Sequence, residues 1–175
     1  MSHMAIAQTA ETLIEEHLRA GRQLRFTIST TSMWPSLSPG DEVLVRATGA
    51  DSLRPGDIVL SRSGNAWRAH RLLARLASGS EMLLVTKGDN SPSRDEGWPA
   101  GQALGVVSAV RRGGREVNLE TRQARWAGAA LALISRYQSD ISRRAWPDLP
   151  RRAALKGLRL ALRLGAAAAQ WMNWL

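Results

Sequence analysis

The expected fold depends first on one stretch of sequence, Ser36-Leu37-Ser38-Pro39-Gly40-Asp41-Glu42-Val43-Leu44-Val45. A similar stretch follows sixteen residues later, Ser52-Leu53-Arg54-Pro55-Gly56-Asp57-Ile58-Val59-Leu60-Ser61. In each copy the Pro-Gly pair supplies the two central residues of a type II turn, because proline fixes φ and glycine accepts a positive φ. A run of aliphatic and β-branched residues follows each turn, which is typical of a strand. The repeat therefore predicts two turn-then-strand units.

Elements on either side extend these two units into a small antiparallel β domain between helices. Three further short strands are expected, at residues 82–86, 103–110 and 116–119, with a glycine-rich hairpin turn at 112–115. The spacing of apolar residues predicts helices at 5–20, 125–144 and 151–174. The predicted fold class is mainly β with flanking α: a short N-terminal helix, an antiparallel β domain and a C-terminal helical pair.

Length and composition indicate one globular domain with a helical appendage. The chain has 175 residues and no cysteine, which excludes disulfides, thiolate metal sites and cysteine nucleophiles. Residues 1–4 look like a cloning remnant, and His3 is set aside with them. The expected organisation is a domain over 5–121, with its N-terminal helix at 5–22 and its β part at 24–119, followed by a tail over 122–175.

The tail carries most of the positive charge. Of the net charge of +9, residues 122–175 contribute eight. In the predicted last helix, Arg152, Lys156, Arg159 and Arg163 form one stripe beside leucines, and Trp171 and Trp174 lie near its end. Such a helix suits an anionic membrane surface through residues 151–175, or it packs on the rest of the chain. Nucleic acid is the less favoured partner, because the β domain is nearly neutral and no helix-turn-helix precedes it.

No apolar run approaches the roughly 20 residues that span a bilayer. Nor does the acidic N-terminus have the basic leader and apolar core of a signal peptide. These features predict a protein in the cytoplasm or peripheral at a membrane. No metal or other cofactor is expected.

The candidate chemistry begins at Thr30-Thr31-Ser32-Met33-Trp34-Pro35. A serine hydroxyl becomes a good nucleophile when a neighbouring base removes its proton, and an imidazole base needs its other nitrogen held by an acceptor. Ser32, His70 and an aspartate, either Asp89 or Asp95, supply these three parts. The alternative interpretation of His70 is a core histidine on a strand, and His17 is predicted to be structural or at the surface.

The order and spacing of four blocks resemble the signal peptidase I and LexA-type serine peptidases. The blocks are Ser32-Met33-Trp34-Pro35, Gly40-Asp41, Gly56-Asp57-Ile58-Val59 with the later His70-Arg71, and Lys87-Gly88-Asp89-Asn90 leading to Gly105-Val106. The resemblance covers roughly residues 24–110. It implies a serine endopeptidase that cleaves a peptide or precursor protein through an acyl-enzyme.

The resemblance also implies roles for single residues. His70 occupies the slot of the base, as in the archaeal and endoplasmic-reticulum types, whereas most bacterial enzymes have lysine there. Asp95 aligns with the catalytic aspartate of the histidine type and is favoured over Asp89. The Ser32 backbone N–H and the Thr30 hydroxyl are the implied oxyanion donors.

Met33 and Trp34 would line the adjoining substrate cleft, with a plain core pair as the alternative. Lys87 is given a structural place. So are Asp41 and Asp57, each of which follows a Pro-Gly turn.

This chain departs from the family pattern in two ways. Thr31 replaces the usual glycine before the nucleophile, and no transmembrane anchor is recognised. The alternative function is therefore a catalytically idle peptidase-like module whose basic C-terminal helices bind anionic membrane or nucleic acid. The sequence leaves the substrate and the oligomeric state open.

Overall fold

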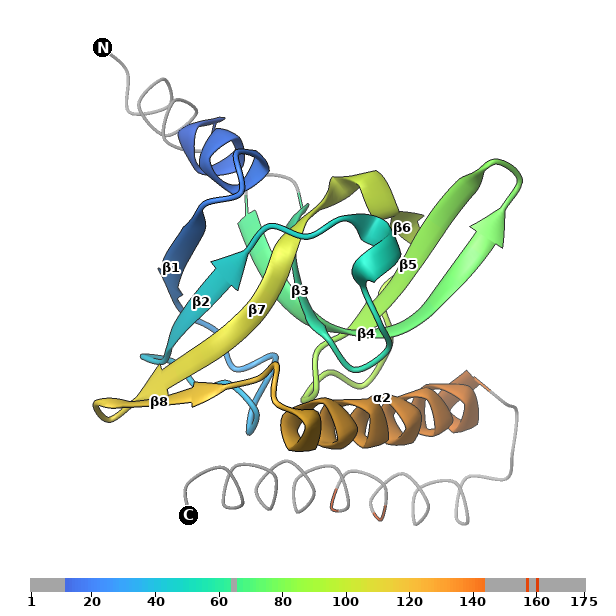
Figure 1. The fold of residues 1–175 in the computed structure, drawn as a ribbon. Coiled ribbons are helices and arrows are strands. Elements are labelled where there is room, and N and C mark those ends of the chain that lie inside the picture. Colours follow the sequence, from blue (N-terminus) through green and yellow to red (C-terminus); the bar gives the residue numbers. More distant parts are fainter. Residues whose placement is uncertain (1–11, 64–65, 144–156, 158–159, 161–175) are drawn as a thin grey trace.

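A computed structural model describes residues 12–63, 66–143, 157 and 160 of the chain. Its centre is one antiparallel sheet that curls into a half-barrel, with a short helix at residues 12–19 on one side and a long helix beneath it (Figure 1). The mainly β fold class with flanking helices is therefore confirmed. The predicted helix over 151–174 lies outside the described residues apart from Gly157 and Leu160.

Eight strands make up the sheet, and every neighbouring pair is antiparallel. Seven of them follow the order β1-β2-β7-β3-β4-β5-β6, and β8 pairs with β7 outside this path. The strands are β1 (Gln23–Thr27), β2 (Glu42–Arg46), β3 (Ile58–Ser63), β4 (Ala66–Ser78), β5 (Glu81–Lys87), β6 (Trp98–Pro99), β7 (Ala103–Arg112) and β8 (Arg115–Asn118). Two 3₁₀ turns, η1 (Ala50–Ser52) and η2 (Ala100–Gln102), precede β3 and β7.

The two Pro-Gly-Asp turns have the predicted geometry. Gly40 and Gly56 have φ of 90° and 105°, and the N–H of Asp41 donates to the Ser38 carbonyl at 3.0 Å. Asp57 makes the same turn bond to Arg54, also at 3.0 Å. Each aspartate carboxylate in turn accepts the N–H three residues earlier, at 2.7 Å from Ser38 and 2.8 Å from Arg54. Asp41 and Asp57 therefore hold their own turns closed, as a structural role requires.

Because the sheet is curled, it buries apolar side chains on both faces. Along β3, Ile58 and Leu60 belong to one core cluster and Val59 to the other, as the alternation of a strand requires. The larger cluster also takes in the N-terminal helix through Leu18, which is fully buried. This packing stabilises the short helix, which has too few residues to be stable alone.

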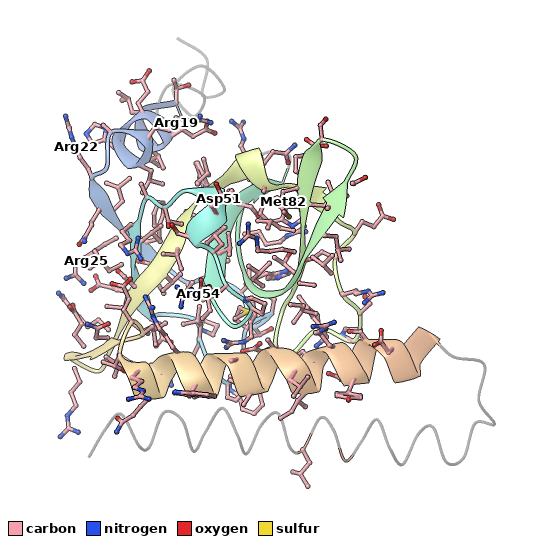
Figure 2. The ribbon with its side chains drawn as sticks, turned by 45° about the vertical axis from the view of Figure 1, so that its right-hand side comes forward. Arg19, Arg22, Arg25, Asp51, Arg54 and Met82 are labelled. Carbon is pink, nitrogen blue, oxygen red and sulfur yellow. The ribbon has the colours of Figure 1, made fainter. Side chains whose placement is uncertain are left out.

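The N-terminal helix ends as predicted at Gly21, whose φ is 77°. The Nδ1 atom of His17 lies 2.9 Å from the Leu13 carbonyl, and Arg22 lies 2.9 Å from Nε2 of His17. Figure 2 shows Arg22 near this helix, with Arg25 below it on β1. His17 is thus engaged within the helix end, in agreement with a structural role.

The long helix α2 (Arg122–Arg143) lies beneath the sheet and packs closely on the second Pro-Gly turn. A Cβ atom at Gly56 would lie 2.6 Å from the backbone nitrogen of Ala129, and one at Gly128 would lie 2.9 Å from the Gly56 carbonyl oxygen. Residues 128, 131, 132, 135, 138 and 139 form its buried face, at helical spacing. Two glycines thus allow the backbones of turn and helix to meet.

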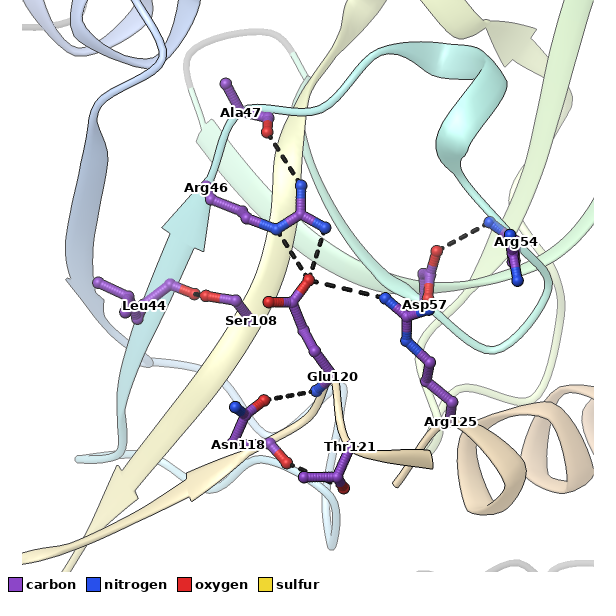
Figure 3. Close-up of polar contacts among 10 residues, drawn as sticks. All are labelled: Leu44, Arg46, Ala47, Arg54, Asp57, Ser108, Asn118, Glu120, Thr121 and Arg125. Atoms are coloured by element: carbon purple, nitrogen blue, oxygen red, sulfur yellow. Dashed lines mark hydrogen bonds and ion pairs between the residues drawn. The ribbon is translucent and has the colours of Figure 1, made fainter. Parts of the chain in front are cut away.

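Polar contacts fasten the beginning of α2 to the sheet (Figure 3). Glu120 accepts hydrogen bonds from Arg46 on β2 and lies 3.8 Å from Arg125 on the helix. Thr121 caps the helix, because its hydroxyl accepts the Ala124 N–H at 3.2 Å. This cap explains why α2 begins at Arg122 and not at the predicted residue 125.

The main difference from the sequence prediction is the β4–β5 hairpin. β4 has 13 residues and was not among the predicted strands, since a strand at His70 entered only as the alternative interpretation of that residue. Its outer half is mostly exposed and carries polar and apolar residues together, so its periodicity is weak. Pairing with β5 stabilises this half.

No helix of the described residues is long and apolar enough to cross a membrane.

The contact between turn and helix leads to a stability prediction. We expect Gly56→Ala to lower the free energy of unfolding by roughly 1–3 kcal/mol more than Gly40→Ala, as overpacking does. Both glycines have positive φ, so both variants carry a backbone cost of about 1–2 kcal/mol. Only Gly56 has helix backbone within contact distance of the added methyl group. Urea unfolding of the two variants measures the difference, and equal losses would contradict the close packing.

Candidate active site

Ser32 lies in the loop that joins β1 to β2. The side chain after it, Met33, is only 2% exposed and belongs to the larger core cluster. Leu37 is buried in the same cluster, and its N–H donates to the Met33 carbonyl at 3.0 Å. The peptide between Trp34 and Pro35 is cis. Two buried anchors thus hold the loop on the sheet while Ser32 itself remains half-buried.

His70 and Arg71 are neighbours on β4, so their side chains point to opposite faces of the sheet. His70 is 8% exposed and Arg71 is 4% exposed. Each of them contacts a different aspartate. This alternation separates the roles of the two aspartates between which the sequence left a choice.

Asp95 is the aspartate that contacts His70. Its Oδ2 atom lies 2.7 Å from Nδ1 of His70 and accepts the Thr86 hydroxyl at 2.7 Å. The Asp95 N–H donates to the Thr86 carbonyl at 2.8 Å, and Arg68 lies 3.6 Å from Oδ1. The carboxylate is thus held on three sides.

Asp89 instead binds Arg71 in a buried, bidentate ion pair. Nε and Nη2 of Arg71 donate to the two carboxylate oxygens at 2.8 and 2.7 Å. Arg71 also donates to the Gly56 carbonyl at 2.8 Å, and the Ser36 hydroxyl donates to Asp89 at 2.5 Å. The Arg71–Asp89 pair therefore joins β4, the Ser32 loop and the second Pro-Gly turn, with Arg71 contacting the turn and the Asp89 carboxylate contacting Arg71 and Ser36.

The surroundings of Asp95 favour its ionised form. Burial raises the pKa of its carboxyl, but hydrogen bonds from His70 and Thr86 and the charges of His70 and Arg68 outweigh this effect. The pKa of Asp95 therefore lies below its ordinary value of 3.8. An ionised carboxylate only accepts hydrogen bonds, so the Nδ1 atom of His70 carries the proton between them. In neutral His70 the Nε2 atom then carries no proton and can accept one.

The Nε2 atom of His70 and the backbone of Ser32 face the same small volume beside Gly88. A Cβ atom at Gly88 would lie 3.1 Å from Nε2 of His70, and 2.6 Å from both the Ser32 carbonyl oxygen and the Ser91 hydroxyl. A side chain there would displace one group or the other. The glycine thus allows the serine loop and the imidazole to approach each other.

Asn90 fixes the orientation of the peptide that precedes Ser32. Its side-chain NH₂ donates to the Thr31 carbonyl at 3.3 Å, and its backbone N–H donates to the Ser32 carbonyl at 2.8 Å. In a trans peptide the N–H points opposite to the carbonyl, so the Ser32 N–H is directed away from the Asn90 amide. Among the described residues, none accepts a hydrogen bond from the Ser32 N–H.

The remaining predicted site residues are divided between the loop surface and the core. The Thr30 hydroxyl lies 3.3 Å from the Ser32 hydroxyl. Trp34 is 39% exposed near Ser32, whereas Met33 is a core residue and does not line an open cleft. Lys87 is fully buried, with its ammonium group 3.3 Å from the Gly88 carbonyl and 3.2 Å from the Gln138 side chain, consistent with the structural place given to it.

Sequence reasoning did not identify Thr86, Asn90 or Arg71 as part of the site. Arg71 and Asn90 belong to the blocks that carry the resemblance, but no role was predicted for either of them. Thr86 had no signal, because a threonine on a buried strand is ordinary.

In comparisons with known proteins, the chain matches no protein-family model and no curated sequence. Within the described part of the chain, no three His, Asp or Glu side chains are grouped to hold a metal ion. The His70–Asp95 contact and the Ser32 loop beside Nε2 of His70 are therefore the features of this site that bear on its chemistry.

The lowered pKa of Asp95 predicts how its substitution acts at different pH. The ionised carboxylate stabilises the folded state above its unfolded pKa, and this contribution is lost as pH falls through the folded pKa. We therefore expect Asp95→Asn to lower the free energy of unfolding at pH 7 and to differ less from the unsubstituted protein near pH 3. Urea unfolding at both pH values measures this.

Asp51→Asn is the matched control, because the side chain of Asp51 is fully exposed. A loss for Asp95→Asn that is the same at pH 7 and pH 3 would contradict a lowered pKa.

Proposed function

We propose that this protein is a serine endopeptidase with a Ser32-His70-Asp95 triad, similar to the histidine type of signal peptidase. The observation that carries the proposal is the 2.7 Å contact between Nδ1 of His70 and Asp95. It leaves Nε2 on the side of the ring that faces the Ser32 loop across Gly88. One nitrogen of His70 is held by a carboxylate and the other lies on the side of the loop that bears Ser32, which supports His70 as the general base for the Ser32 hydroxyl.

In this mechanism Nε2 of His70 accepts the hydroxyl proton while Ser32 Oγ attacks the carbonyl carbon of a peptide bond. The resulting tetrahedral intermediate breaks its C–N bond, and His70 returns the proton to the leaving amine. Water then attacks the carbonyl carbon of the Ser32 ester while His70 takes a proton from it. The second intermediate breaks its bond to Ser32 Oγ, which recovers the proton from His70, and the acid product leaves. Asp95 stays ionised and stabilises the imidazolium in both steps.

The oxyanion formed in these steps needs hydrogen-bond donors already in place. The Ser32 N–H and the Thr30 hydroxyl are assigned this role. The Thr30 hydroxyl lies beside the attacking oxygen, and Asn90 orients the peptide that bears the N–H. Both donors come from one short loop held by the core.

The substrate is proposed to be a peptide or precursor protein. Trp34, exposed at the Ser32 loop, offers an apolar surface for it. A role of residues 151–175 at a membrane surface remains a proposal from sequence, since that segment lies almost wholly outside the described residues.

A fluorophosphonate probe tests the nucleophile directly. We expect the protein to be labelled on Ser32, and labelling to disappear in Ser32→Ala and in His70→Ala, because each removes one half of the activated pair. Mass spectrometry of the labelled peptide identifies the site. His70→Lys is expected to react far more slowly, since an ammonium is neither placed nor deprotonated like the imidazole.

Ser80→Ala is the control, because Ser80 lies at the exposed turn between β4 and β5. Labelling of Ser32→Ala at the rate of Ser80→Ala would exclude Ser32 as the nucleophile and favour the idle module.

Thr30 tests the oxyanion site. We expect Thr30→Val to lower kcat for hydrolysis of a p-nitrophenyl ester by about 10²–10³ with little change in KM, because a donor to the transition state is lost. Thr30→Ser keeps the hydroxyl and should keep most of the rate. If Thr30→Val and Thr30→Ser give the same kcat, the hydroxyl has no part in the reaction.

A further inference from the structure

A chain of hydrogen bonds extends from Asp95 away from His70. The Thr86 hydroxyl lies 2.7 Å from Oδ2 of Asp95, and the indole Nε1 of Trp98 lies 3.1 Å from the same hydroxyl. Thr86 is on β5 and 2% exposed, and Trp98 is on the neighbouring strand β6. The register of β5 and β6 pairs Leu84 with Trp98, so the hydrogen bond from Trp98 to Thr86 connects two neighbouring strands.

The direction of these bonds follows from what each group can donate. An indole N–H only donates, and an ionised carboxylate only accepts. The Thr86 hydroxyl has one proton, so it accepts from Trp98 and must donate to Asp95. Trp98 thereby prevents the hydroxyl proton from turning away from the carboxylate.

Oδ2 of Asp95 therefore accepts two short hydrogen bonds, one from Thr86 and one from His70. Two donors on one oxygen restrict rotation of the carboxylate about its last torsion. The side chain of Asp95 is 20% exposed, so solvent alone would leave this torsion less restricted. The orientation of His70 depends on that oxygen, because Nδ1 is bound to it.

We propose that Thr86 and Trp98 are positioning residues that hold Asp95 in the orientation that orders His70. The inference rests on the proposed function for its catalytic consequence, and on the geometry alone for its effect on His70. Trp98 acts through Thr86, so its contribution exists only while residue 86 has a hydroxyl.

The experiment uses the full chain with Thr86→Val, Thr86→Ser, Trp98→Phe and the double variant Thr86→Val/Trp98→Phe. Two quantities are measured for each: the rate of acylation of Ser32 by a fluorophosphonate, and the NMR resonance of the His70 Nδ1 proton. Valine has nearly the shape of threonine, and thermal unfolding verifies that each variant is folded. His70→Gln assigns the His70 signal, because it removes that signal alone among those of the three histidines.

We expect Thr86→Val to slow acylation on the order of 10²-fold, as misplacement of a catalytic group does, and to shift or broaden the His70 resonance. Thr86→Ser should restore both. Trp98→Phe should slow acylation less, and only in the threonine background, so the double variant should match Thr86→Val. A purely packing role of Trp98 would give additive losses.

Two results would overturn the proposal. One is an unchanged His70 resonance in Thr86→Val, and the other is an equal effect of Trp98→Phe with threonine and with valine at residue 86. If the unsubstituted protein is not acylated but its His70 resonance still responds to Thr86→Val, the positioning role stands and the peptidase function fails.

Discussion

The buried ion pair between Arg71 and Asp89 is the interaction on which the arrangement of the site depends. The guanidinium of Arg71 also donates to the Gly56 carbonyl and the Ser36 hydroxyl. This one side chain therefore joins β4, the second Pro-Gly turn, the Ser32 loop and the loop after β5. Removing one partner of such a pair is costly, because the other charge stays buried without compensation. Both carboxylate oxygens of Asp89 and most guanidinium N–H groups of Arg71 are hydrogen-bonded. The ion pair therefore determines where the four segments lie.

The Arg71–Asp89 ion pair and the candidate triad lie on opposite faces of strand β4. His70 meets Asp95 on one face of β4, and Arg71 meets Asp89 on the other. The loop that begins at Gly88 supplies both aspartates. Holding Asp89 on the buried side brings Gly88 and Asn90 against the Ser32 loop, where Asn90 binds two consecutive carbonyls. The ion pair on one face of β4 therefore helps to position the His70–Asp95 contact on the other.

Helix α2 supports this arrangement from below the sheet. It touches the Gly56 turn through Gly128, and Gln138 binds the buried Lys87, whose ammonium group also contacts the Gly88 carbonyl. The helix thus contacts the same turn and the same loop that the ion pair joins. The cap at Thr121, which apolar spacing does not reveal, explains why the sequence predicted a start three residues too late.

The sequence by itself determined the features that depend on contiguous residues. The two Pro-Gly-Asp turns, the strands after them, the Gly113-Gly114 hairpin and the helix end at Gly21 follow from local backbone preferences. It also supplied the residue types of the site. Only the tertiary structure decided that Asp95 contacts His70, 25 residues away, while Asp89 contacts Arg71, and that Met33 enters the core. Such pairings depend on strand alternation, on the register with its bulge between Leu72 and Ala74, and on the path of a loop, none of which is encoded in adjacent residues.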